Sequence, residues 1–208
     1  VKDASGSVVE AKALSLKEVL KLRGVKNILI CFFCYCALEQ TTGLWASSYL
    51  TLYKGVPAET AASFASMFFI GITIGRALNG FLAMKLSDTQ MVRMGQVLIA
   101  CGVVILFLPL GASVSLAGFV MIGLGCAPIY PCLIHSTPDH FGADKSQAVI
   151  GIQMACAYVG ISLMPPLFGL IAGHITVSLL PVYLSAILVL MIVMHEGLIR
   201  KTAQKEAA

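Results

Sequence analysis

The sequence predicts an all-α integral membrane protein built around six transmembrane helices. The chain of 208 residues is 58% hydrophobic and only 12% charged, and its mean hydropathy is +0.91. About a quarter of the residues in a soluble domain are charged. Six apolar stretches are separated by short polar breaks, and a helix of about 20 apolar residues crosses the hydrocarbon layer of a bilayer.

The segments that flank the apolar stretches are polar. Residues 1–26 begin with Val rather than Met and contain no signal peptide, so we expect the chain to be part of a longer protein. This segment is predicted to be a cytoplasmic linker that ends in a short amphipathic helix over residues 14–26. Apolar residues recur there at helical spacing, with Lys17 and Lys21 on the opposite face. Residues 200–208 are predicted to form a polar cytoplasmic tail.

Residues that break helices or carry charge separate the expected spans. The spans are expected at residues 27–52, 59–84, 91–110, 116–137, 146–172 and 178–198. The breaks between them fall at residues 53–57, 85–90, 111–115, 138–145 and 173–177. Each span therefore has the length that a membrane-crossing helix needs.

The distribution of basic residues predicts the orientation of the bundle. The basic residues on the side of the N-terminus are Lys2, Lys12, Lys17, Lys21, Arg23, Lys26, Lys85, Arg93, Lys145, Arg200, Lys201 and Lys205. The opposite side has only Lys54, and Arg76 is the one basic residue inside a span. Because cytoplasmic loops carry the excess of Lys and Arg, we expect a multi-pass protein of the plasma membrane with both ends in the cytoplasm.

The first span carries an acidic residue in its middle. At ~1.5 Å per residue, Glu39 lies roughly 18 Å deep, next to Gln40. A carboxylate at this depth is a functional-site candidate, because it is costly unless it faces protein or water. Glu39 either contacts a substrate or titrates during transport, or it is a structural acid paired with Arg76 of the second span.

Other polar residues follow a weak repeat of three spans. They concentrate in the first, second, fourth and fifth spans, whereas the third and sixth are almost featureless. Three-helix repeats of this kind are typical of transporters. In the fourth span Tyr130 lies between Pro128 and Pro131, which weaken the helix mid-membrane, and the fifth span carries Gln153 and Tyr158. These residues suit either a binding wall or helix packing.

The second span and its loop read GITIGRALNGFLAMKLSDTQMVRMG. This stretch resembles the second-half copy of the loop motif of the major facilitator superfamily, in which a Gly-rich helix end precedes basic residues at a tight cytoplasmic turn. Gly80 and Lys85 match that motif, whereas Met84 and Ser87 stand where it has Asp and Gly, so the gating salt bridge of that Asp does not carry over. The candidate loop-motif residues are Gly75, Arg76, Gly80, Lys85, Asp88 and Arg93.

The first span, FFCYCALEQTTGLWASSYL, is similar to the fucose/glucose–galactose proton symporter branch in Glu39, Gly43 and Trp45, as is GLGCAPIYP in the fourth span. This resemblance implies half of a major-facilitator fold, namely helices seven to twelve of a twelve-helix carrier. It also implies an N-terminal six-helix partner half and a small polar substrate such as a sugar. Protons are a candidate coupling ion, although the main proton-carrying acids of that branch lie in the N-terminal half.

These features lead us to expect alternating-access transport by half of a secondary carrier. The candidate substrate-binding residues are Glu39, Gln40, Trp45, Arg76, Tyr130, Gln153 and Tyr158. The alternative is a non-transporting six-helix module or receptor that dimerises. We expect no enzymatic activity, cofactor or metal site, because no catalytic or phosphate-binding motif occurs. The basic loops are orientation signals rather than a nucleic-acid surface.

Overall fold

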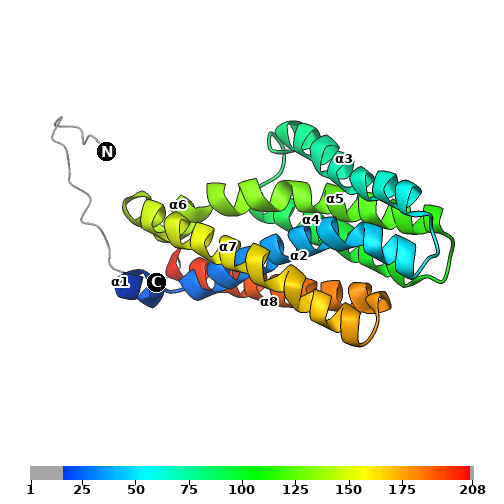
Figure 1. Cartoon of the computed structure of the whole chain (residues 1–208). Helices are drawn as coiled ribbons and strands as arrows, with labels where there is room; N and C mark the ends of the chain where they lie inside the picture. The colour runs from blue at the N-terminus through cyan, green and yellow to red at the C-terminus, as the bar shows by residue number, and fades with distance from the viewer. Residues whose placement is uncertain (1–15, 207–208) are drawn as a thin grey trace.

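The computed structural model describes residues 16–206 and confirms the all-helical membrane fold (Figure 1). Within these residues there are no strands, and six helices are long and apolar enough to cross a membrane. They are α2 (Val25–Leu52), α3 (Ala58–Leu82), α4 (Asp88–Phe107), α5 (Ala112–His135), α7 (Ala143–His174) and α8 (Leu180–Glu206). Three short helices complete the described part: α1 (Leu16–Lys21), α6 (Thr137–Phe141) and the 3-10 turn η1 (Val177–Leu179).

The helices extend beyond several of the expected span ends. The expected loop at 138–145 contains α6, which has a proline in its first turn and ends at Gly142 with a φ of 89°. Proline is tolerated at a helix start, and a positive φ suits glycine. Helix α8 continues through most of the expected tail, because a polar flank can maintain helical hydrogen bonds outside the hydrocarbon. Residues 1–15 of the expected linker and 207–208 of the tail lie outside the described residues, and the bilayer boundaries stay predictions.

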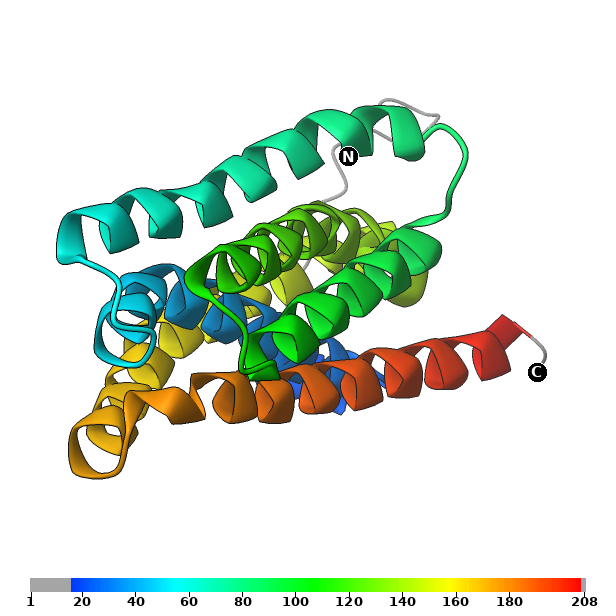
Figure 2. The same cartoon turned by 90° about the vertical axis from the view of Figure 1, so that its right-hand side faces the viewer.

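The six long helices form two triplets, α2–α3–α4 and α5–α7–α8. The first helix of each triplet is central: α2 packs against α7, α8, α3 and α5, and α5 packs against α4, α3 and α2. The second helices, α3 and α7, are the least buried of the six. The third helices, α4 and α8, pack against each other. Figure 2 shows α3 along one edge of the bundle and α8 along the opposite edge.

Helix α5 approaches both neighbours through glycines. A Cβ atom added to Gly125 would lie 2.5 Å from the carbonyl oxygen of Gly95 in α4, and one added to Gly71 of α3 would lie 2.6 Å from the carbonyl oxygen of Val120. Real Cβ atoms do not come this close, so only glycine permits these backbone contacts. Small residues give membrane helices their close packing in the same way, because lipid supplies no hydrophobic force between helices.

Helix α3 separates from α5 towards its C-terminal end (Figures 1 and 2). A Cβ atom on Gly75 would still lie 2.5 Å from the Ala127 Cβ atom, but one on Gly80 would have no atom within 4 Å. Phe81 and Met84, further along the chain, are largely exposed. The two helices therefore form a wedge that begins just beyond Gly75.

Charged side chains join the helices at the same end of the bundle. The guanidinium of Arg93 in α4 donates to both carboxylate oxygens of Glu196 in α8, at 2.6 and 2.7 Å. Bidentate pairs of this kind fix orientation as well as adding energy. The helix α4 itself begins with a capping box, in which Ser87 and Gln90 each accept from the other's backbone N–H.

The glycine contacts predict that Gly125→Val destabilises the protein. The added side chain would overlap the α4 backbone, and overpacking of this kind typically costs about 1–3 kcal/mol. The measurement is the thermal unfolding midpoint of the full-length protein in detergent. Gly151→Val is the matched control, because Gly151 lies within α7 and its Cβ position has no atom within 4 Å. Equal melting temperatures for the two variants would contradict this account of the packing.

Candidate functional site

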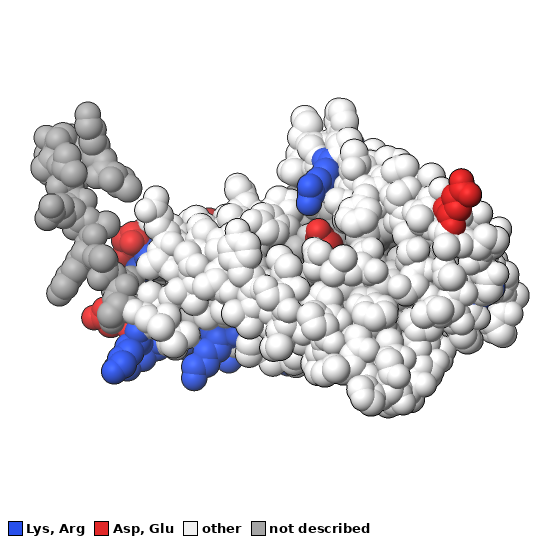
Figure 3. Space-filling model, in the orientation of Figure 1, with Lys and Arg blue, Asp and Glu red and all other residues white. Residues whose placement is uncertain are grey.

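A small cavity of about 160 Å³ lies between α2, α3, α5 and α7, halfway along α2. It is lined by residues of α2, α3, α5 and α7: Tyr35, Cys36, Glu39, Gln40, Arg76, Tyr130 and Ile161. Four of the seven sequence-predicted binding residues, namely Glu39, Gln40, Arg76 and Tyr130, therefore share one cavity. In Figure 3, an acidic side chain lies in a hollow near the middle of the visible face, with a basic side chain close beside it, and the surface immediately around the two is uncharged.

The carboxylate of Glu39 accepts a hydrogen bond from the phenol of Tyr35, one helical turn earlier in α2. The Tyr35 ring also packs near the ring of Tyr130, with the centroids 6.2 Å apart. Tyr130 itself lies 5.1 Å from the Phe32 ring and places its hydroxyl 3.4 Å from the sulfur of Met154 in α7. Sequence reasoning missed Tyr35, although its spacing of four from Glu39 places both on one helix face.

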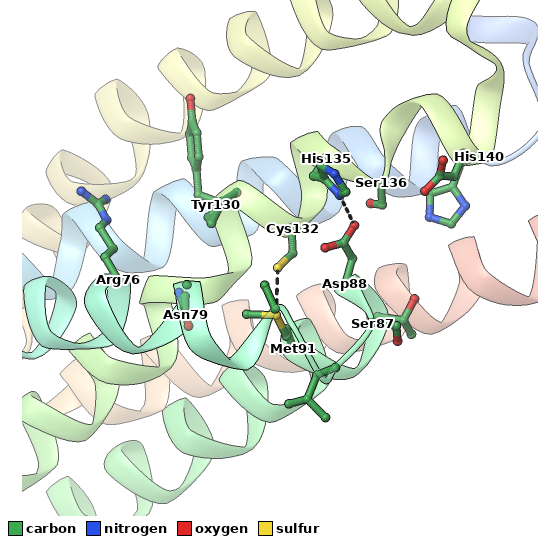
Figure 4. Close-up of a pocket in the computed structure, with 16 residues that line it drawn as sticks. Arg76, Asn79, Ser87, Asp88, Met91, Tyr130, Cys132, His135, Ser136 and His140 are labelled. Atoms are coloured by element: carbon green, nitrogen blue, oxygen red, sulfur yellow. Dashed lines mark hydrogen bonds and ion pairs between the residues drawn. The ribbon is translucent and has the colours of Figure 1, made fainter.

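Arg76 enters the same cavity from α3 without forming an ion pair with Glu39. Among the described residues, the charged pairs within 4.0 Å are Arg93–Glu196, His135–Asp88, Lys145–Asp144 and His195–Glu196. In Figure 4, Arg76 and Tyr130 both project into the space between α3, α5 and α7. The expected acid and base are thus brought into one polar site, and neither neutralises the other by direct contact.

A second, larger cavity of about 900 Å³ fills the wedge between α3 and α5. It shares Arg76 and Tyr130 with the small cavity, so the two meet at these side chains. Its size lies within the ~300–1,000 Å³ typical of small-molecule sites. Asn79 and Ser136 line it, and within the described residues the buried Asn79 Nδ2 atom has no hydrogen-bond partner. The wedge therefore offers a path from the middle of the bundle to its end that is lined in part by polar side chains.

The outer end of the larger cavity is charged. Nδ1 of His135 at the end of α5 lies 2.6 Å from a carboxylate oxygen of Asp88 at the start of α4 (Figure 4). Asp139 and His140 of α6 line the same end. Asp88, a loop-motif candidate, thus forms a contact between α4 and α5 at the end of the cavity. Arg93, another loop-motif candidate, joins α4 to α8 through its ion pair with Glu196.

The other sequence-predicted residues lie away from the small cavity. Trp45 donates from Nε1 to the Pro165 carbonyl at 3.1 Å and packs edge-on against Phe168, which joins α2 to α7. Gln153 is fully buried, with its Oε1 atom 3.1 Å from the Thr137 hydroxyl. Tyr158 is 69% exposed on α7. Of the loop-motif candidates, Gly80 lines the larger cavity, and Lys85 is exposed beside it.

Comparison with known proteins adds to this geometry. A family model described as the Major Facilitator Superfamily matches residues 28–207, which include all six long helices in whole or in most part. The chain belongs to the major facilitator superfamily. The resemblance seen in the loop motif of the second span is therefore confirmed at the level of the family.

A sequence relative is similar to part of this chain. An MFS-type transporter of Yersinia pestis, described as uncharacterised, is 25% identical over 143 residues, which are 69% of this chain and 37% of the relative. The chain spans less than half the length of this relative. The match therefore covers only part of that transporter.

Solved structures show the same architecture. A crystal structure of the fucose:proton symporter of E. coli, an asparagine-to-alanine variant, superimposes with a TM-score of 0.71 at 17% identity, covering 93% of this chain and 48% of that chain. A crystal structure of the transporter FucP in the outward conformation gives a TM-score of 0.72 at 17% identity, covering 91% of this chain and 48% of that one. At this identity the likeness shows the fold alone, and the fold is half of a major-facilitator fold.

The absence of a direct ion pair between Glu39 and Arg76 predicts that their effects on stability are only weakly coupled. The stability changes of Glu39→Gln and Arg76→Gln should couple less in the double variant than those of a bonded ion pair, because the two side chains share a cavity but make no direct contact. The measurement is a double-mutant cycle on the full-length protein in detergent. Arg93→Gln with Glu196→Gln is the positive control and should show coupling. Recovery of stability in the Glu39/Arg76 double variant would instead indicate a structural ion pair.

Proposed function

We propose that this chain is the C-terminal half of a secondary carrier that moves a small polar solute across the membrane. The observation that most supports this proposal is the small cavity that Glu39, Gln40, Arg76 and Tyr130 line together. Charged side chains inside a membrane bundle are costly and mark substrate or ion pathways. Superfamily membership and the fold of the symporter structures support transport as the activity.

The proposed substrate is a neutral, polyhydroxylated solute such as a sugar. The cavity lining combines acceptors on Glu39, donors on Arg76 and both on Gln40, so it can bond hydroxyl groups that both donate and accept. One acid and one base give the lining no net charge, which does not favour a charged solute. The ring of Tyr130, which lines the cavity and packs against the buried Phe32 ring, supplies an apolar face beside these groups, as a sugar ring requires.

Alternating access is proposed to use the exposed faces of α3 and α7. These are the second helices of their triplets and the least buried of the six, and an N-terminal six-helix half would cover them. Tyr158 on α7 would then face the partner half rather than lipid. The larger cavity along α3 would be the route by which the solute leaves the small cavity when the two halves rock apart on that side.

Proton coupling is proposed to involve Glu39. It is the one acidic side chain that lines the small cavity, and its carboxylate meets both the Tyr35 phenol and the solute space. A carboxylate in that place can exchange a proton as solute binds and leaves. The fucose:proton symporter, whose fold this chain shares, supports the proposal.

Transport assays on the full-length carrier in proteoliposomes test this proposal. Glu39→Gln should lower proton-driven uptake of the monosaccharide that the carrier accepts about tenfold or more, because a glutamine amide cannot bind and release a proton as a carboxylate does. The pH dependence of uptake should flatten over about pH 5–8, because the group proposed to exchange the proton is then absent. The matched control is Glu59→Gln, because Glu59 is an exposed acid at the start of α3.

Two results would contradict the proposal in different ways. Unchanged uptake and pH dependence in Glu39→Gln would make Glu39 structural. No uptake of any tested solute by the intact full-length protein, together with a stable dimer, would favour the alternative of a non-transporting membrane module.

The orientation is tested by cysteine labelling in a background without the seven native cysteines. Lys54→Cys lies in the turn between α2 and α3, and Asp144→Cys lies in the first turn of α7 at the other end of the bundle. With the basic ends in the cytoplasm, an impermeant maleimide should label position 54 in whole cells and position 144 only in inverted vesicles. Labelling of position 144 in whole cells would reverse the orientation.

A further inference from the structure

A third cavity, of about 330 Å³, lies at the end of the bundle where α1 meets α2 and the C-terminal part of α8. It shares no lining residue with the two cavities described above. Its lining consists of Leu20, Lys21, Leu22, Arg23, Gly24, Lys26, Asn27 and Lys201. Figure 3 shows basic side chains projecting from the end of the molecule that carries α1.

The lining of this basic cavity contains four cationic residues and no acidic one. Lys21, Lys26 and Lys201 take part in none of the ion pairs found among the described residues. Three lysine ammonium groups around one cavity repel one another, so an anion bound there would be favoured. A phosphate group suits these donors, because its oxygens accept several charge-assisted hydrogen bonds at once.

The walls of the basic cavity are held in place by polar contacts. The Lys201 ammonium donates to the Asn27 side-chain oxygen at 2.7 Å, and the Asn27 amide donates to the Met194 carbonyl at 3.3 Å. These contacts connect the first turn of α2 to α8. Gly24 has a φ of 91° at the junction of α1 and α2, a conformation that glycine adopts readily, and it folds α1 back against the bundle.

The apolar side of the basic cavity faces outward. Val19 of α1 is fully buried in a small core with Phe141 and Leu198, which anchors α1. Leu16 and Leu20 of the same helix are 59% and 36% exposed, and Leu20 also lines the cavity. A short helix with exposed leucines and lysines at the end of a membrane bundle suits a position at the lipid–water interface.

We propose that this basic cavity binds the phosphate headgroup of an anionic phospholipid. Lys21, Lys26 and Lys201 surround the phosphate, and Leu20 contacts the upper part of the acyl chains. Basic pockets between membrane helices bind anionic headgroups in this way. Exposed leucines beside the cavity favour a lipid over a soluble phosphate compound, because the latter would gain nothing from them. The proposal does not depend on what the carrier transports.

Native mass spectrometry of the full-length protein, titrated with phosphatidylglycerol in neutral detergent, tests this assignment. Lys21→Gln with Lys26→Gln should raise the dissociation constant about 25-fold, because each basic residue near an anionic lipid contributes a roughly fivefold factor. Neither side chain has a hydrogen bond among the described residues, so folding should be kept.

A single variant serves if the double variant unfolds. Lys26→Gln alone should raise the dissociation constant about fivefold, and Lys26→Arg should bind as the unchanged protein does.

The matched control removes the same charge elsewhere on the same side of the bundle. Lys17→Gln with Lys145→Gln takes one lysine from α1 and one from α7, neither of which lines the basic cavity. The dissociation constant should change by less than about threefold, because salt screens charges that lie away from the cavity. An equal loss in both double variants would overturn the site in favour of general surface charge. Displacement of phosphatidylglycerol by millimolar inorganic phosphate would overturn the lipid assignment in favour of a soluble anion.

Discussion

The close backbone contact between α5 and its two neighbours is the constraint on which the rest of the structure depends. In lipid, helices gain little from burying apolar side chains, so the contact distance between backbones decides how tightly they pack. Gly95 and Gly125 let α4 lie against α5, and Gly71 and Gly75 do the same for α3. Where this series of glycines ends on α3, the helices part and the cavity begins. The position of the larger cavity is therefore set by the point at which the close packing of α3 against α5 ends.

The charges inside the bundle follow from the same wedge. A lone charge in hydrocarbon is costly, and a direct pair between Glu39 and Arg76 would be one way to avoid that cost. The protein instead places both beside one cavity, with Tyr35 bonded to the acid. An acid and a base held apart can each bond a solute, whereas a closed pair would have to break first. The geometry thus favours a binding site over a structural brace.

Helix α2 connects the two proposed sites. Its first turn contributes Lys26 and Asn27 to the basic cavity, and its middle contributes Glu39 to the solute cavity. Because Asn27 also bonds Lys201 of α8, a lipid at the basic cavity would contact a helix that extends directly to the substrate. The fold therefore places the proposed lipid site and the proposed solute site on one helix.

The sequence by itself determined the class of fold, the number of long apolar helices and the place of Glu39 halfway along the first of them. These follow from local properties, since a chain in hydrocarbon must satisfy its backbone within each helix and hydropathy marks where each helix runs. Only the tertiary structure decided which side chains meet. It placed Tyr130 with Glu39, but it used Trp45 and Gln153 for contacts between helices. The rotation of a helix about its axis depends on its neighbours, and weak polar patterns along apolar spans leave that rotation open.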